Sequence, residues 1–132
     1  MKTIKTKDLS NSQLNYLVAV AATNNSSTVS LDEHGYTFIN GIPCMPCTSW
    51  EQTGLLIEDN NLCLIPWPEN LPRLPHSPPT TKWTAVPQNK DIDYIDIYKE
   101  DHPTQPTPQR AVAMWIVQKA FGESVMLPSS LN

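Results

Sequence analysis

The segment 48–54 carries residue types that suit a small polar ligand. Its candidate binding residues are two hydroxyl side chains, a tryptophan, an amide and a glycine, namely Thr48, Ser49, Trp50, Gln52 and Gly54. An aromatic ring can stack on a flat group such as a nucleobase, short polar groups can hydrogen-bond to it, and a glycine lets the backbone approach closely. The alternative is that Trp50 covers the sheet while its polar neighbours satisfy backbone groups of an irregular loop. Both interpretations stay open on the sequence alone.

The phosphates of such a ligand would need a positive charge or a helix N-terminus, and Arg110 combines the two. It falls in the first turn of a helix that is expected to open at Thr107 and Pro108. The free N–H groups of a helix start attract anions, and a guanidinium binds phosphate through paired hydrogen bonds. We therefore hypothesise a nucleotide site in which Trp50 or Trp83 stacks on the base and Arg110 binds the phosphates.

Cys44 and Cys47 form a CxxC pair, and a proline precedes the second cysteine as it does in thioredoxin-type redox sites. Such sites need the first cysteine at a helix N-terminus, where the dipole lowers its pKa. Here Pro43 comes before the pair, and no apolar helical pattern follows it closely. A zinc ribbon would need a second close pair, whereas Cys63 is the only other cysteine. We expect ordinary loop thiols, with no metal and no cofactor.

The remaining ionisable residues form no pattern of an enzyme. The three histidines lie in expected loops, and the chain has no nucleophile elbow, P-loop or HExxH motif. Asp91, Asp93 and Asp96 lack the spacing and the glycine of an EF-hand, so they are interpreted as the solvent face of an edge strand. We predict a protein without catalytic activity.

Composition indicates one small domain with stiff, extended loops. The 132 residues suffice for a single domain, 1–132, and include 13 prolines but only 4 glycines. The net charge of −4 argues against binding to the phosphates of DNA or RNA. No apolar run reaches the roughly 18 residues of a membrane span, and the N-terminus lacks the apolar region of a signal peptide. We expect a cytoplasmic protein that does not associate with membranes.

Helical periodicity appears near both ends of the chain. Apolar residues recur at i, i+3, i+4 and i+7 within 10–23, which predicts a helix there, and Ser10 and Gln13 have the spacing of a capping box. A second helix is predicted over 107–121 and is closed by Gly122. Its apolar residues cover more surface than one sheet face would bury, which predicts a homo-oligomer.

Short strands and loops are expected between and around these helices. The expected strands are 28–31, 36–39, 55–57, 62–65, 82–86, 91–97 and 125–127, with a loop over 42–54. A proline-rich surface excursion is expected over 66–82, because proline cannot donate to a sheet ladder. The predicted fold is α+β, with a small, mainly antiparallel sheet packed by an N-terminal and a C-terminal helix.

Four segments spread over the chain carry a recognisable pattern. They are Leu9 with LNYLVA at 14–19, TSWEQTGLLIE at 48–58, Trp83 with Ala85, and the run from Thr107 to Pro128. Together they resemble the NinX-like family of small accessory proteins of lambdoid phages and prophages, and Trp-x-Gln-x-Gly-x-x-Ile-Glu is the most specific part. That family usually has Asp where Ser49 stands and Arg where Met114 stands.

The resemblance implies a phage accessory product that acts in the host cytoplasm, with no known cofactor and no settled activity. Combined with the segment 48–54, it predicts a counter-defence protein that binds and sequesters a small nucleotide-like host signal. The alternative is a protein–protein inhibitor or adaptor that docks on a host enzyme through the strand 91–97 or the proline-rich arm 66–82.

Overall fold

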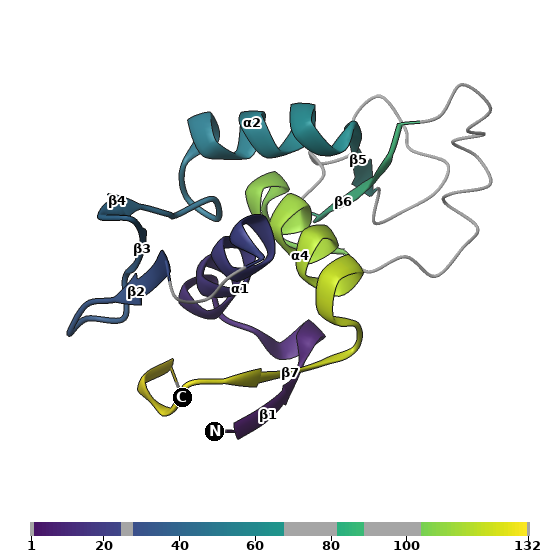
Figure 1. The fold of residues 1–132 in the computed structure, drawn as a ribbon. Helices are drawn as coiled ribbons and strands as arrows, with labels where there is room; N and C mark the ends of the chain where they lie inside the picture. The colour runs from purple at the N-terminus through teal and green to yellow at the C-terminus, as the bar shows by residue number, and fades with distance from the viewer. Residues whose placement is uncertain (1, 25–27, 68–81, 89–103, 132) are drawn as a thin grey trace.

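The α+β fold predicted from the sequence is confirmed by a computed structural model, which describes residues 2–24, 28–67, 82–88 and 104–131. Within these residues the α-helices are α1 (Asn11–Thr23), α2 (Trp50–Asn60) and α4 (Pro108–Phe121) (Figure 1). Two short 3-10 helices, η1 (Thr6–Asp8) and η3 (Ser129–Leu131), lie near the chain ends.

Helix α1 begins at the capping box that the sequence predicts. The Ser10 Oγ accepts a hydrogen bond from the Gln13 N–H at 3.3 Å, and the Gln13 Oε1 accepts one from the Ser10 N–H at 2.8 Å. These two bonds satisfy N–H groups that have no partner inside the helix. The helix ends at Asn24, whose φ of 49° places it in the left-handed region that commonly closes helices.

Helix α4 likewise has the predicted ends. The Thr107 side chain accepts a hydrogen bond from the Arg110 N–H at 3.2 Å, and Pro108 occupies the first turn, where a missing N–H is harmless. Gly122 closes the helix at a φ of 83°, a conformation that favours glycine, and its N–H donates to the Gln118 carbonyl at 2.9 Å.

The strands form three small antiparallel sheets within the described residues, rather than the one sheet that was predicted. The first pairs β1 (Lys2–Lys5) with β7 (Ser124–Leu127), so the two ends of the chain meet. The second contains β2 (Val29–Leu31), β3 (Thr37–Ile39) and β4 (Ile42–Pro43). The third pairs β5 (Leu62–Trp67) with β6 (Lys82–Pro87).

Helix α2 corrects two predictions, the strand 55–57 and the loop over all of 42–54. Thr53, Leu56, Ile57 and Asn60 recur at i, i+3, i+4 and i+7, and they form the less exposed face of this helix. The run Leu55–Ile57 resembles a buried strand when it is taken alone, because a short apolar run does not distinguish the two structures. The strand predicted at 62–65 lies within β5, which pairs with β6.

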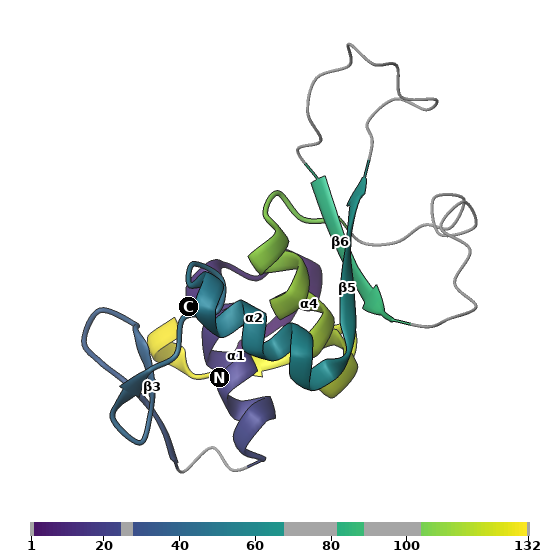
Figure 2. The same ribbon diagram turned by 90° about the horizontal axis from the view of Figure 1, so that it is seen from above.

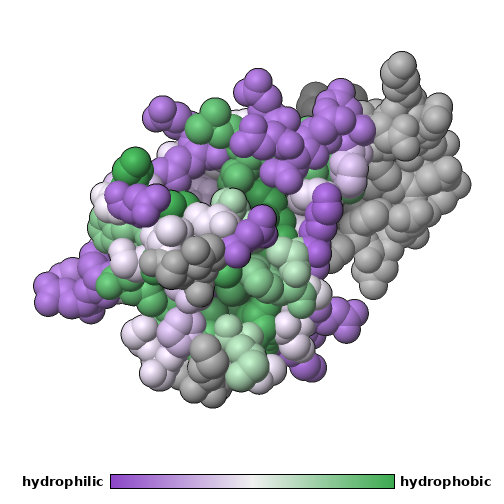
Figure 3. Space-filling model, in the orientation of Figure 1, coloured by the Kyte–Doolittle hydropathy of each residue, from purple (hydrophilic) through white to green (hydrophobic). Residues whose placement is uncertain are grey.

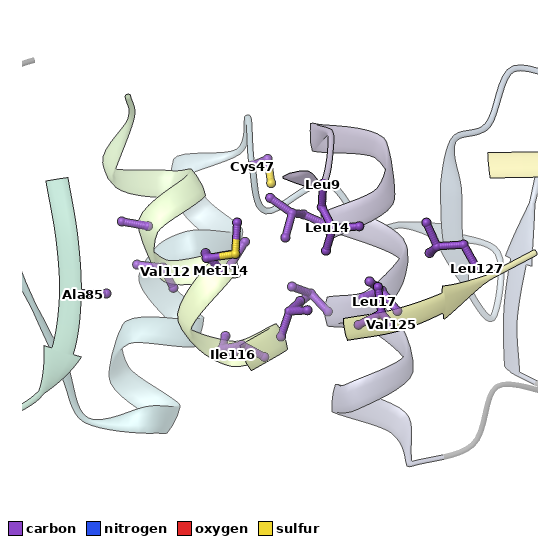
Figure 4. Packing of buried hydrophobic residues seen from close by; sticks show 14 of the residues in the cluster. Leu9, Leu14, Leu17, Cys47, Ala85, Val112, Met114, Ile116, Val125 and Leu127 are labelled. Carbon is purple, nitrogen blue, oxygen red and sulfur yellow. The ribbon is translucent and has the colours of Figure 1, made fainter. Parts of the chain in front are cut away.

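The hydrophobic core lies between α1 and α4 and extends to the strands on either side. Figure 4 shows side chains of α1 and α4 between the two helices, with Cys47 near them and Leu127 on the other side of α1, all within one buried cluster. Leu14, Val112 and Val117 are fully buried there. Helix α4 lies between α1 and the β5–β6 pair, and it also contacts α2 (Figure 2).

This packing bears on the predicted homo-oligomer. Most of the apolar surface of α4 is covered within the chain, by α1, α2 and β6, whereas Ala120 and Phe121 at its C-terminal end are exposed. Most of the surface that suggested a second subunit is therefore buried, and the oligomer stays a prediction with little support from it.

Two other predictions lie outside the described residues. The proline-rich excursion 66–82 does so except for Pro66, Trp67 and Lys82, and so does the acidic strand 91–97. Among the described helices, none is long and apolar enough to cross a membrane.

Candidate functional site

The residues predicted at 48–54 lie at the start of α2, and most of their polar groups bond to the backbone nearby. The Ser49 Oγ caps the helix by accepting the Gln52 N–H at 3.3 Å. The Gln52 side chain accepts the Met45 N–H at 2.7 Å and donates to the Pro43 carbonyl at 2.9 Å. The Thr48 Oγ1 contacts the Met45 carbonyl at 3.4 Å. These contacts order the turn that leads into the helix, as the structural interpretation of this segment expects.

Trp50 and Gly54 lie on the exposed side of α2. Trp50 keeps 57% of its surface exposed, so it does not cover the sheet. A Cβ added to Gly54 would meet nothing within 4 Å. None of the three hollows described below is lined by a residue of 48–54.

Trp83 and Arg110, the other two predicted residues, meet at Gln105. The Trp83 N–H donates to the Gln105 carbonyl at 2.8 Å, and the Gln105 N–H donates back at 2.8 Å. The Arg110 Nε donates to the Gln105 Oε1 at 3.0 Å. The structure therefore brings this pair together, apart from the group at the start of α2.

Arg110 is also the link between the starts of α4 and α1. Its Nη1 donates to the Asn11 Oδ1 at 2.6 Å, and its Nη2 donates to the Leu9 carbonyl at 2.7 Å. The planar guanidinium offers several donors in a fixed geometry, which suits a residue that joins three segments. These bonds favour a structural role for Arg110 over the phosphate contact that the sequence suggested.

Gln105 also lines a polar hollow of about 560 Å³ between η1, β7 and the C-terminal half of α4. Its lining residues are Lys5, Thr6, Lys7, Thr104, Gln105, Gln118, Glu123 and Ser124. Two lysines and one glutamate give the described residues of this lining a net charge of +1, in a chain whose net charge is −4. Lys5 and Lys7 are exposed and form no ion pair with the described residues. The hollow is thus a local cationic site on an acidic protein.

A second hollow, of about 210 Å³, adjoins the first between β6 and α4. It shares Gln105 and Gln118 with the polar hollow, and its other lining residues are Thr84, Ala85, Val86, Pro87, Ala111, Met114 and Trp115. Trp115 is half-buried, packs against the core and is one of the residues that line this hollow. A cationic compartment and an apolar, aromatic compartment therefore meet at two side-chain amides.

A third hollow, of about 430 Å³, lies where α1, α2 and α4 come together. Its lining is mostly apolar and includes Val18, Ala21, Leu56 and Ile116. Trp115 lines both this hollow and the second one. The Lys119 Nζ lies 4.8 Å from the centre of the Trp115 ring, a cation–π contact.

The CxxC thiols are protonated at neutral pH. Burial raises the pKa of Cys44 to about 11. Burial raises that of Cys47 to about 12, although the Arg110 charge opposes the shift. A redox nucleophile or a metal ligand needs the thiolate, so these shifts oppose both roles. Among the described residues, no three His, Cys, Asp or Glu side chains gather as metal ligands.

Sequence reasoning missed Lys5, Lys7, Gln105 and Gln118. Gln118 follows Ala111 by seven residues and Trp115 by three, so its place on the same face of α4 could have been found. The two lysines reach the hollow through the pairing of β1 with β7, which joins residues from opposite ends of the chain. No local pattern reveals such a contact.

No protein-family model matches this chain, and no curated protein matches it either. The resemblance to NinX-like proteins therefore stays a hypothesis based on the motifs. The chain departs from the NinX-like pattern at Ser49 and at Met114. Ser49 acts as a helix cap, a role in which the Asp usual in that family would serve equally well. Met114 is only 2% exposed, so the usual Arg would place a charge in the core.

Proposed function

We propose that this protein binds a small nucleotide-like anion in the two joined hollows and sequesters it without chemical change. The observation that carries the proposal is the meeting of a cationic and an aromatic compartment at Gln105 and Gln118. Phosphates would lie at Lys5 and Lys7, and the base would lie toward Trp115.

Size and chemistry support this arrangement. Ligand pockets commonly measure about 300–1,000 Å³, a range that includes the 560 Å³ of the polar compartment. Lysine ammonium groups bind phosphate as compact charges, and carboxamides offer both a donor and an acceptor to the edge of a base. An aromatic side chain adds stacking, which tolerates different bases.

Binding without turnover is supported by what lines the two compartments. Among the described residues, the lining contains one carboxylate, Glu123, and neither histidine nor cysteine. Acid–base or nucleophilic catalysis usually needs two such groups within hydrogen-bond reach of each other. Together with the NinX-like resemblance, this leads us to propose a phage counter-defence protein that acts in the host cytoplasm.

Native mass spectrometry tests the proposal directly. The purified full chain is mixed with linear, cyclic and ADP-ribose-type nucleotides, and its mass reports both the ligand and the number of subunits. We expect a discrete adduct of fixed stoichiometry whose ligand mass does not change with time. A changed ligand mass would indicate catalysis instead.

Variants then assign the adduct to the hollows. The double variant Lys5→Ala/Lys7→Ala should bind about tenfold more weakly or worse, because a hydrogen bond to a charged group contributes about 1.5–3 kcal/mol. Lys82→Ala removes one lysine charge from β6, outside both hollows, and serves as a control for the loss of a surface charge. Equal binding by all three proteins would exclude this site.

The second candidate function is the protein–protein inhibitor or adaptor. If the chain keeps its own mass with every nucleotide, the proposal of a small ligand fails, and a host protein becomes the favoured partner. Deletion of 66–80 then tests the proline-rich arm, with circular dichroism as the check that the fold is intact.

A further inference from the structure

Helix α2 has an exposed face that its packing does not use. We define the outer face of α2 as Trp50, Glu51, Gly54, Leu55 and Glu58, all of which are exposed. At about 100° per residue these five positions span a sector of about 140°. The opposite face packs on α4 and β5, so α2 is covered from one side only (Figure 1).

The outer face has two large apolar residues in water. Trp50 and Leu55 are each 57% exposed. Ile42 of β4 is 69% exposed, and the Gln52 bond to the Pro43 carbonyl holds β4 beside the first turn of α2. Figure 3 shows apolar surface over α2 and β4 between hydrophilic side chains. Exposed tryptophan within a mixed apolar and charged surface is typical of a protein-binding site.

Gly54 lies in the middle of this face, and the fold does not require it. Its backbone is helical without a positive φ, and a Cβ there would meet none of the described residues within 4 Å. Glycine destabilises a helix interior relative to alanine. The missing side chain leaves a shallow gap between Trp50 and Glu58, one turn away on either side, into which another chain can approach the helix backbone.

The charge of α2 indicates what kind of chain would bind to its outer face. The helix contains Glu51, Glu58 and Asp59 and has no lysine or arginine. The last two lie in the final turn, where negative charge is unfavourable beside the helix dipole. Neither forms an ion pair with the described residues.

This charge selects among possible occupants. A second α2 would bring three more negative charges against these, and a nucleotide or nucleic acid would be repelled. A positively charged chain would be attracted. The face is therefore distinct from the cationic hollow, and its occupant has the opposite charge.

We propose that the outer face of α2 docks a basic, amphipathic segment of a partner protein. Its apolar side chains contact Trp50 and Leu55, its lysine or arginine residues face Glu51 and Glu58, and its backbone or a small residue packs over Gly54. This interaction is independent of the nucleotide site.

Selection from a random library of 16-residue peptides on the full chain tests the proposal. We expect enriched peptides that combine Lys or Arg with large apolar residues. Their binding should fall at least fivefold with Trp50→Ala. It should be unchanged with Tyr36→Ala, a matched control that removes an equally exposed aromatic, at 57%, from the turn between β2 and β3. Enrichment of acidic peptides, or equal binding to both variants, would overturn the proposal.

Gly54→Ala gives the sharper test, because misfolding cannot explain its result. The methyl group should raise the melting temperature while it weakens the selected peptides at least fivefold. Nucleotide binding in the hollows should not change. A variant that is more stable and binds the peptides as well as the parent does would contradict a close approach at this residue.

Discussion

Helices α2 and α4 both begin at a hydroxyl residue whose side chain accepts an N–H from three positions further on. Beyond that shared start they differ in burial. Six residues of α4 are buried, from Ala111 to Val117, whereas α2 buries only Thr53. Helix α4 packs against α1, α2 and β6, and its Arg110 bonds to Gln105, Asn11 and Leu9. Helix α2 keeps its outer face exposed.

The largest expected effect is the loss of a buried side chain from α4, compared with the loss of an exposed side chain from α2. Met114→Ala in α4 should lower the free energy of unfolding by about 2–5 kcal/mol, because Met114 is only 2% exposed and its removal leaves a cavity in the core. Leu55→Ala on the outer face of α2 should change it by less than about 0.5 kcal/mol. Urea denaturation measures both. Similar losses in the two variants would show that α2 is buried by something in solution, such as a second subunit.

Arg110→Ala tests whether the start of α4 serves structure or ligand. It should lower the free energy of unfolding by about 2–3 kcal/mol, since it removes charge-assisted hydrogen bonds to Gln105, Asn11 and Leu9. Arg110→Lys should recover only part of this, because an ammonium cannot reach three acceptors in a fork. A variant of unchanged stability that loses nucleotide binding would instead restore the phosphate contact first inferred from the sequence.

The same two helices show which parts of the fold a sequence can reveal. Both ends of α4 carry local signals, Thr107-Pro108 at the start and Gly122 at the end, and the helix lies where they predict. In α2 the helix period is present, but Gly54 and the apolar run after it imitate a turn followed by a strand. Local chemistry is ambiguous there, and packing on α4 decides the structure.

The candidate site was harder to predict than the fold. The residue types at 48–54 suggested a pocket, whereas in the structure Ser49 and Gln52 bond to backbone groups around the start of α2. The cationic hollow depends on Lys5 and Lys7, which line it together with Gln118 of α4 once β1 pairs with β7. Such long-range contacts follow from the completed fold and leave no spacing in the sequence.

The buried thiols that precede α2 should make the free energy of unfolding fall at alkaline pH. Cys47, beside α1, and Cys44 have pKa values raised by burial from 9.0 to about 12 and about 11. The folded state favours the protonated thiols, so their contribution is complete below pH 9 and is lost as the pH rises toward 11–12. The free energy of unfolding should fall more steeply between pH 9 and 10.5 in the parent than in Cys44→Ala/Cys47→Ala. Parallel curves would mean that the thiols are exposed in solution.

The smallest expected change in stability comes from removing either of the two helix caps. Thr107→Ala and Ser49→Ala should each cost about 1 kcal/mol, the usual contribution of a capping hydroxyl. The two variants should destabilise different parts of the protein, because α4 packs against most of the core whereas α2 packs from one side only. Hydrogen exchange distinguishes the two cases.

Thr107→Ala should speed exchange throughout the protein by lowering global stability. Ser49→Ala should speed it chiefly within α2, since this helix can open while α1 and α4 stay packed. Equal acceleration everywhere in both variants would mean that α2 unfolds only with the core, and its free outer face would then belong to a rigid docking surface.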